Sequence, residues 1–322
     1  MKIVIPGGSG QVGTILARAF HTDGHDVVVL SRQRHLRPWR VVDWDGATLG
    51  DWQREIDGAE VVINLAGRSV NCRYNAANRQ EILRSRVEST RVVGKAIARA
   101  RRPPRTWLQA STATIYAHRY DAANDEWGPL GGSESSAPSS WRFSIEVARA
   151  WEQAFDDAVT TATRKVTLRS AMTLSPDAGG VFDTLLGLVR RGFGGAAGNG
   201  HQFISWIHSE DFVAAVRWLI ERHQIDGVVN VASPNPLPNA EFMRVLRKAY
   251  GVPFGLPAQS WMLEIGAAFM RTETELILKS RRVVPRRLLE HGFMFKFPDW
   301  ADAAADLCER WEATHRIPDS AA

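Results

Sequence analysis

Cysteine and long apolar runs are scarce in this sequence of 322 residues. Its two cysteines, Cys72 and Cys308, lie far apart and lack the spacing of metal ligands, so we expect neither a disulfide framework nor a metal site. No uninterrupted apolar stretch approaches the roughly 20 residues that cross a membrane. The apolar residues after Lys2 are too few for a signal-peptide core. These absences predict a cytoplasmic protein without a membrane partner.

Acidic residues are outnumbered, with 35 Asp and Glu against 40 Lys and Arg, which gives a formal net charge of +5. The arginines cluster at residues 32–40, 99–105 and 281–287, and proline, tryptophan or apolar residues interrupt each cluster. Because no nucleic-acid-binding motif accompanies them, we assign the clusters to solvated loops and helix ends. We expect a small-molecule substrate and no nucleic-acid partner.

Glycine is concentrated near the start of the chain, where residues 2–13 have the sequence KIVIPGGSGQVG. A short β-branched run ends in Gly7, Gly10 and Gly13, and amphipathic helical sequence follows to about residue 21. Glycine lets a backbone approach a pyrophosphate closely, and a helix N-terminus offers unpaired N–H groups and a positive dipole end. The same pattern also serves tight turns for steric reasons alone, so the surrounding sequence has to decide.

The second apolar run, residues 26–30, ends at Ser31 and Arg32. A βαβ unit places at this point the residue that contacts the adenosine ribose. An acid would bind the 2′-hydroxyl of NAD, whereas an arginine pairs with the 2′-phosphate of NADP. Arg32, helped by Arg34, therefore favours NADP; the alternative is an arginine in an exposed loop.

Three further runs predict strands at residues 40–45, 60–67 and 106–112, with a long helix between the last two. Asp43 or Asp45 is placed either to accept from the adenine amino group or to cap the following turn. This alternation predicts a doubly wound parallel sheet of the Rossmann type, in which ligands lie at the carboxyl ends of the strands. The residues expected to contact the cofactor are Gly7, Gly8, Ser9, Gly10, Gln11, Val12, Gly13, Ser31, Arg32, Asp45, Leu65, Ala66, Gly67 and Arg86.

The second half of the chain predicts a smaller C-terminal α/β lobe for the substrate. We assign residues 1–175 to the dinucleotide-binding domain, to which residues 201–232 return, and residues 176–200 and 233–322 to the substrate lobe. The alternating phenylalanines of residues 293–297 predict one short strand with an apolar face.

Six segments resemble a known family: Gly7-x-x-Gly10-x-x-Gly13, Asn64-Leu65-Ala66-Gly67, Ser111-Thr112-Ala113-Thr114-Ile115-Tyr116, FISWIHSED at 203–211, VNVASP at 229–234 and RVVPRRLLEHGF at 282–293. The first three resemble the extended short-chain dehydrogenase/reductase superfamily, which includes sugar-nucleotide epimerases and dehydratases. The last three are similar to its atypical subgroup labelled "epimerase family protein". This resemblance implies a nucleotide sugar as substrate, and a homodimer through the long helices; the sequence leaves monomer and homodimer open.

Members of the superfamily carry Tyr-x-x-x-Lys on the helix after the fifth strand, where the lysine depresses the tyrosine pKa for acid–base work. None of the four tyrosines here is followed by lysine four residues later. Phe143 and Val147 occupy what look like those two places. Because neither side chain moves or tunes a proton, the usual mechanism does not carry over.

Four residues are candidates to replace this pair. Ser111 and Thr112 end the fifth strand and either contact a substrate oxygen or simply terminate the strand. Tyr116 either donates a hydrogen bond to substrate or has a structural role. Glu146 is a general base if desolvation raises its pKa, and otherwise a solvated helix residue.

Three further groups have a weaker claim. His118 is a minor candidate, and His208 is expected to cap the helix that follows it. Arg190 and Arg191 either meet a substrate anion or lie at a helix carboxyl end, where the helix dipole favours cations.

Two functions remain in competition. One is an NADP-dependent oxidoreductase or sugar-nucleotide epimerase-like enzyme of the atypical extended type. The other is a protein that binds NADP(H) without catalysis and senses its redox state, which the missing Tyr-x-x-x-Lys pair favours.

Overall fold

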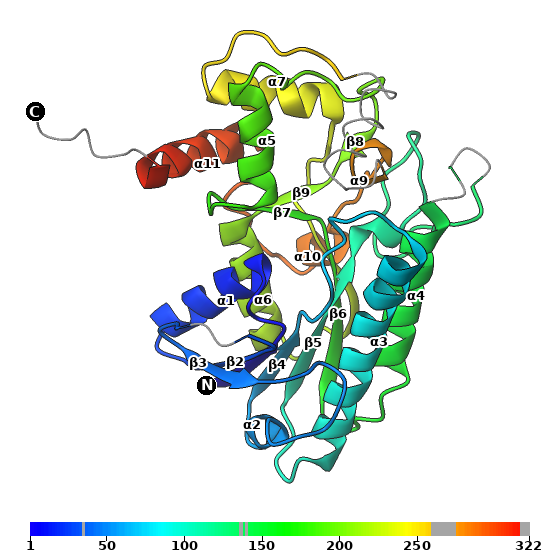
Figure 1. The fold of residues 1–322 in the computed structure, drawn as a ribbon, viewed down its shortest axis with the longest axis vertical. Helices are drawn as coiled ribbons and strands as arrows, with labels where there is room; N and C mark the ends of the chain where they lie inside the picture. The colour runs from blue at the N-terminus through cyan, green and yellow to red at the C-terminus, as the bar shows by residue number, and fades with distance from the viewer. Residues whose placement is uncertain (34–35, 135–137, 139–140, 259–274, 316–322) are drawn as a thin grey trace, which may run out of the picture.

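A parallel sheet of seven strands forms the centre of the computed structural model, which describes residues 1–33, 36–134, 138, 141–258 and 275–315 (Figure 1). The strand order is β10-β6-β5-β4-β1-β2-β3, so the direction in which strands are added reverses between β1 and β4. The strands are β1 (Lys2–Pro6), β2 (Asp26–Ser31), β3 (Arg40–Asp43), β4 (Val61–Asn64), β5 (Thr106–Thr112), β6 (Arg164–Ser170) and β10 (Gly227–Val231). The predicted doubly wound sheet is confirmed.

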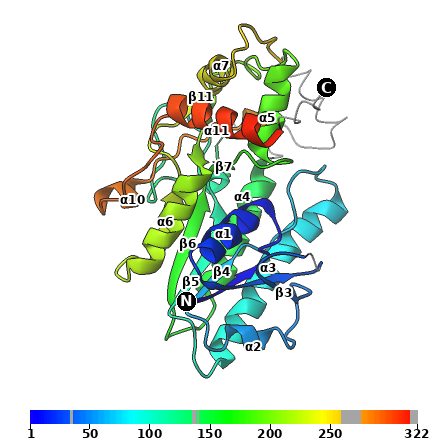
Figure 2. The same ribbon diagram turned by 90° about the vertical axis from the view of Figure 1, so that its left-hand side faces the viewer.

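Helices cover both faces of the sheet, as Figures 1 and 2 show. On one face lie α1 (Gln11–Thr22) and α6 (Ser209–Glu221); on the other lie α2 (Gln53–Ile56), α3 (Ala76–Arg99) and α4 (Arg142–Asp156). Successive side chains of a strand point to opposite faces, so Ile3 and Ile5 pack with α1 and α6 whereas Val4 packs with α3. In the described part of the chain, no helix has the length and apolar character needed to cross a membrane.

A second core lies beyond the end of β6. There α5 (Val181–Arg190), α7 (Asn239–Ala249) and α11 (Trp300–His315) pack together, at the top of Figure 1. The rings of Phe242 and Trp300 stack with their centroids 4.1 Å apart at the centre of this core. Two short sheets complete it: β7 (Met172–Leu174) pairs with β9 (Trp206–His208), and β8 (Phe203–Ile204) pairs with β11 (Leu237–Pro238). The division of the chain into two domains stays a prediction.

The outer edge of the sheet is covered by side chains. β10 is an end strand, and α10 (Arg286–Glu290) packs against it. Nη1 of Arg287 donates to the carbonyl oxygens of Asp226 (2.5 Å) and Val228 (2.6 Å). The backbone N–H of Asn230 donates to Glu126 Oε1 at 2.9 Å. These outward-facing backbone groups of β10 are therefore already hydrogen-bonded.

The strand predicted at residues 293–297 is wrong, because this described segment forms no strand. The backbone N–H groups of Lys296 and Phe297 donate instead to the two carboxylate oxygens of the buried Asp211, at 2.7 and 2.9 Å. Phe293 joins the core under α6, and Phe297 joins the core of the second lobe. The alternating phenylalanines therefore reflect two separate apolar contacts, those of Phe293 and Phe297, beside a backbone that is bound by the Asp211 carboxylate.

His208 links α6 to α11. Its Nδ1 accepts from the backbone N–H of Glu210 (3.1 Å), which confirms the predicted capping role, and its Nε2 donates to Asp306 Oδ2 (3.1 Å). Since Nδ1 is an acceptor, the ring is neutral. Burial lowers the pKa of His208 to about 4, although the Asp306 carboxylate opposes this shift.

We expect the free energy of unfolding to fall between pH 6.5 and 4.5 through this residue. In that window the unfolded chain binds a proton at His208, whose ordinary pKa is about 6.5, and the folded chain does not. In His208→Asn, urea denaturation at the two pH values should show a pH-dependent loss smaller by roughly 2 kcal/mol. The exposed His223 supplies the control: His223→Asn should retain the wild-type dependence. An unchanged loss in His208→Asn would contradict the assignment.

Candidate active site

The turn between β1 and α1 is a tight crossing with one open side. A Cβ on Gly7, whose φ is +75°, would lie 2.6 Å from Ala66 Cα, and a Cβ on Gly13 would lie 2.4 Å from Gly8 Cα. A Cβ on Gly10 would instead have no neighbour closer than the Gly7 carbonyl oxygen at 3.8 Å. No side chain caps the N-terminus of α1. The missing side chains of Gly7 and Gly13 thus permit close packing. The missing side chain of Gly10 leaves room for an anion beside the uncapped N–H groups of α1.

The second lobe touches this turn. Gly180, the N-cap of α5, lies against the Gln11 side chain: a Cβ there would be 2.0 Å from Gln11 Nε2, so a side chain at position 180 would displace that amide. Arg18 of α1 forms a bidentate ion pair with Asp177, at 3.0 and 2.7 Å. Gln11 at the start of α1 and Arg18 further along it therefore lie against residues of the second lobe.

The end of β2 lies directly beside the turn. Ser31 Oγ donates to Ser9 Oγ at 3.0 Å. The next residue, Arg32, is exposed and lines a hollow of about 780 Å³ together with Asp45, Trp44 and Trp52. The structure thus brings Ser9, Ser31, Arg32 and Asp45 to one side of the sheet. Arg34 lies outside the described residues.

Asp45 caps the turn after β3, one of the two roles expected from the sequence. Its Oδ1 accepts from the backbone N–H groups of Ala47 and Thr48, both at 2.9 Å. Although burial opposes the shift, these bonds and that of the Thr48 hydroxyl hold the pKa of Asp45 below its usual range. A contact with adenine stays a prediction for this residue.

A half-buried cation, Arg86 of α3, lies beside the end of β4. Leu65 and Ala66 follow the strand, and a Cβ on Gly67 would lie 3.1 Å from the guanidinium carbon of Arg86. Arg86 Nη1 donates to the carbonyl oxygens of Arg68 (3.0 Å) and Ile82 (3.1 Å). Burial lowers its pKa to about 10. Among the described residues, no carboxylate lies within ion-pair distance of it.

The two places of the absent Tyr-x-x-x-Lys pair are apolar. Phe143 and Val147 of α4 are buried and pack with Ile82 of α3. The ring of Tyr74, from the loop before α3, meets the Phe143 ring edge-on with centroids 5.1 Å apart. Neither the Phe143 nor the Val147 side chain can transfer a proton.

Ser111 and Tyr116 belong to a buried structural network. Ser111 Oγ donates to Glu152 Oε1 at 2.5 Å, and Glu152 accepts from both Nε and Nη2 of Arg169 at 2.8 and 2.7 Å. Tyr116 Oη donates to Asn230 Oδ1 (2.8 Å) and accepts from Arg169 Nη1 (3.0 Å). Burial raises the pKa of Tyr116 to about 12. Both hydroxyls are hydrogen-bonded within the protein, which agrees with the structural alternative for each; a substrate contact stays a prediction for Ser111 and Tyr116.

Of the other two candidates, Thr112 caps a turn and Glu146 is exposed. Thr112 Oγ1 accepts from the N–H of Thr114 and so caps the short η1 turn (Ala113–Ile115), but the side chain is only half-buried and its hydroxyl proton is not used there. A substrate contact stays a prediction for Thr112. Glu146 is exposed on the outer side of α4, which removes the desolvation that its role as a base required.

The weaker candidates also have local roles. His118 Nδ1 accepts from the N–H of Ser280 at 2.9 Å, and burial lowers its pKa. The guanidinium of Arg190 lies over the Trp311 ring at 4.7 Å. Arg191 donates to the Gly187 carbonyl oxygen within its own helix. These contacts need no ligand.

A polar cluster between α4 and the C-terminal segment was not found from the sequence. Ser144 Oγ donates to Glu275 Oε2 at 2.6 Å; Glu275 begins α9 (Glu275–Leu278). Lys279 Nζ donates to the Thr114 carbonyl oxygen at 2.7 Å, and burial lowers its pKa to about 8. Arg281 Nε donates to Thr114 Oγ1 at 3.0 Å. The arginine cluster at residues 281–287 was a signal in the sequence, but Thr114, which binds Lys279 and Arg281, lies 165 and 167 residues before them.

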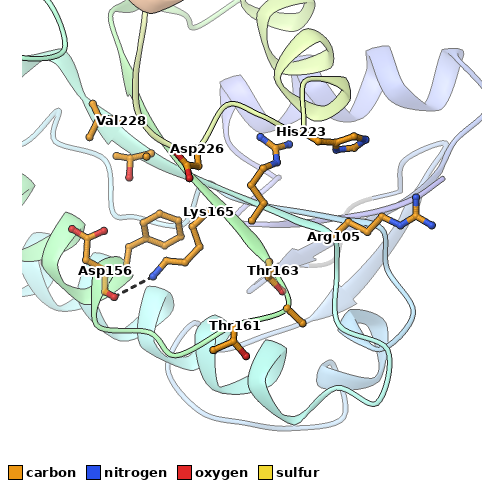
Figure 3. A pocket seen from close by; sticks show the side chains of 13 residues that line it. Arg105, Asp156, Thr161, Thr163, Lys165, His223, Asp226 and Val228 are labelled. Atoms are coloured by element: carbon orange, nitrogen blue, oxygen red, sulfur yellow. Dashed lines mark hydrogen bonds between the residues drawn. The ribbon is translucent and has the colours of Figure 1, made fainter.

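A second hollow, of about 660 Å³, lies at the opposite edge of the sheet (Figure 3). It is lined at the starts of β5, β6 and β10 by Arg105, Lys165 and Asp226. Lys165 Nζ is bound to the carbonyl oxygen of Asp156 at 3.1 Å, the dashed contact in Figure 3. Since ligands of such sheets bind at the carboxyl ends of strands, this hollow is separate from the candidate site. In the described residues, no group of three His, Cys, Asp or Glu is arranged to hold a metal ion.

Comparison with known proteins gives relatives along the whole chain. "Epimerase family protein SDR39U1" of Bos taurus is 32% identical over 311 residues, which cover 95% of this chain and 99% of the relative. The crystal structure of the human SDR39U1 protein with NADPH has a TM-score of 0.83 at 30% identity, covering 96% of this chain and 99% of that one. A nucleoside-diphosphate sugar epimerase from Corynebacterium glutamicum has a TM-score of 0.73 at 27% identity, covering 98% of this chain and 62% of that one.

Two family models match. The domain of unknown function DUF1731 matches residues 260–307. The model described as "NAD dependent epimerase/dehydratase family" matches residues 3–232, well over half of the chain. With the glycine turn, the strand order and the relatives in agreement, the chain belongs to the NAD dependent epimerase/dehydratase family.

Proposed function

We propose that this chain binds NADP(H) and is an oxidoreductase or sugar-nucleotide epimerase-like enzyme of the atypical extended short-chain dehydrogenase type. One observation carries the proposal: the open glycine turn and Arg32 lie side by side, joined through the Ser9–Ser31 hydrogen bond. The turn fits a pyrophosphate, and a guanidinium at the exit of β2 fits a 2′-phosphate. The NADPH in the human relative's crystal structure supports the choice of cofactor.

The proposed substrate is a nucleotide sugar, which the name of the Corynebacterium relative supports. When bound, the nicotinamide supplies or accepts a hydride. The protein's own part is to hold the pyrophosphate at the N-terminus of α1, to select the phosphorylated ribose through Arg32, and to bring the substrate lobe against α1 through the Arg18–Asp177 pair. A screen of nucleotide sugars and small carbonyl compounds in which no NADPH is consumed would count against enzymatic activity.

The apolar side chains at Phe143 and Val147 favour a second function, redox sensing without catalysis. A sensor must bind NADP+ and NADPH with different affinities, because a ligand shifts only the states that it distinguishes. Equal affinities in calorimetric titration would exclude this function.

The first prediction of the proposed function concerns the choice between NADPH and NADH. Wild type should bind NADPH more tightly, and Arg32→Ala should reduce that preference by roughly 10- to 100-fold, because a charge-assisted contact to the 2′-phosphate is lost. Isothermal titration with both cofactors measures the ratio. Arg99→Ala, at the far end of α3 and exposed, is the control and should keep the wild-type ratio. A preference unchanged in Arg32→Ala would contradict the assignment.

The second prediction separates the glycines of the turn. Gly10→Val should weaken NADPH binding at least about 100-fold while lowering stability by less than roughly 1 kcal/mol, because its φ of −71° suits any residue and only the cradle is filled. Gly7→Ala should instead destabilise the fold, because a Cβ collides with Ala66 at a positive φ. Titration and thermal unfolding distinguish the two effects. If Gly10→Val bound NADPH as tightly as wild type, the assignment of the pyrophosphate to this turn would be wrong.

A further inference from the structure

Two polar side chains from α3 and the loop before it lie near Phe143 and Val147 of α4: the phenol of Tyr74 and the guanidinium of Arg86. Tyr74 directly precedes Asn75, the N-cap of α3, and its ring lies against Phe143. Arg86, three turns further along α3, places its guanidinium carbon 5.0 Å from the ring of Trp151. Trp151 lies one turn beyond Val147 on the same face of α4. Tyr74 thus lies against the place of the missing tyrosine, and Arg86 lies against the residue one turn beyond the place of the missing lysine.

We propose that Tyr74 is the proton-transferring residue of this site and that Arg86 is the cation that supports it, in place of a tyrosine and lysine on α4. This inference rests on the proposed NADP(H)-dependent function and names the residues that would carry its chemistry. Arg86 is suited to the part because it lies beside Gly67 at the cofactor side of β4, where its guanidinium is hydrogen-bonded to the carbonyl oxygens of Arg68 and Ile82 and lies over the Trp151 ring.

Tyr74 is connected to a carboxylate through one hydroxyl. Its phenol is hydrogen-bonded to the Ser144 side chain, and Ser144 Oγ donates to Glu275 Oε2 at 2.6 Å. Because a carboxylate only accepts, the Ser144 oxygen is left to accept from the phenol. Ser144 follows Phe143 on α4, so the chain of hydrogen bonds begins at the vacated tyrosine place and ends on the buried Glu275.

The charges that face the phenol come from four segments. Burial raises the pKa of Tyr74 to about 12, and the charges of Glu275 and Cys72 act in the same direction, whereas the charge of Arg86 opposes the shift. Two more cations lie nearby: Arg281, from the C-terminal segment, and Arg79 of α3, whose Nε donates to the Tyr74 carbonyl oxygen at 2.8 Å and whose guanidinium lies 4.9 Å from the centre of the Phe143 ring. Without a ligand the phenol is therefore protonated, and a further positive charge placed beside it lowers its pKa.

The proton balance of an alcohol oxidation follows from this chain. The hydroxyl proton of the substrate passes to the Tyr74 oxygen as the phenol proton moves to Ser144 and the Ser144 proton moves to Glu275. The carbon loses its hydride to the oxidised nicotinamide, so two electrons and two hydrogens leave the alcohol and a carbonyl remains. Glu275 ends protonated; reduction of a carbonyl reverses each transfer.

The test uses the small number of tyrosines. With ¹³C at the ring carbon bearing the hydroxyl, the chain gives four tyrosine signals, and Tyr74→Phe identifies the one from Tyr74. At about pH 10, a pKa of about 12 leaves roughly 1% of this phenol ionised. Saturating NADP+, whose nicotinamide is cationic, should lower the pKa by roughly 1 to 3 units and shift the signal toward the phenolate position.

Two variants and one internal control sharpen the result. Arg86→Met and Arg86→Lys should both reduce the ionised fraction in the NADP+ complex, because methionine carries no charge and burial leaves a lysine at this position neutral at about pH 10. Tyr250 at the end of α7 lies in the second lobe, and its signal should not respond. A role of Tyr74 in packing alone predicts no response to NADP+ in any variant.

Calorimetry on the same samples separates the two possible failures. If NADP+ binds and the Tyr74 signal stays at the neutral position, or if Arg86→Met responds as wild type does, the assignment of Tyr74 and Arg86 is overturned while cofactor binding stands. If NADP+ and NADPH do not bind, the proposed function fails and this inference fails with it.

Discussion

The close approach of Gly7 to Ala66 is the contact from which the rest of the site follows. It brings the turn after β1 against the end of β4, at the point where the strand order of the sheet reverses. In sheets of this kind that reversal opens the crevice in which ligands bind. Any side chain at position 7 would push the two strand ends apart, so the geometry of the crevice depends on one missing Cβ. Gly10, three residues later, faces the space that this contact creates.

The polar groups around the site come mainly from elements other than α4, the helix on which a Tyr-x-x-x-Lys pair would lie. α4 contributes apolar packing at Phe143 and Val147 and a single hydroxyl at Ser144. Cations come from α3 and from the segment after α9, in Arg86, Lys279 and Arg281. Burial lowers the pKa of each of these three groups. Carbonyl and hydroxyl oxygens, and electrostatic contact with Glu275 or Tyr74, stabilise their charged forms. An interior with several cations and few carboxylates is suited to an anionic ligand.

The sequence was sufficient for the sheet and for the glycine turn, because both depend on local patterns. Apolar runs of four to six residues mark strands buried on both faces, and the glycine spacing fixes a strand-turn-helix unit. It was not sufficient to choose between the two roles left open for Ser111 and Tyr116, whose hydrogen-bond partners Glu152 and Asn230 lie 41 and 114 residues away. A hydroxyl at the end of a strand looks the same in sequence whether it faces a ligand or a buried carboxylate. Tyr74 was passed over because its neighbours, Phe143 and Glu275, come from distant parts of the chain.

The occupied edge of β10 has a consequence for assembly. With Arg287 bound to its carbonyl oxygens and Glu126 to the N–H of Asn230, this strand offers few free backbone groups to a strand from another molecule. A second copy of the chain cannot continue the sheet here without first displacing those two side chains. Self-association through this border, whether in an ordered pair or in an aggregate, is therefore opposed by one arginine and one glutamate.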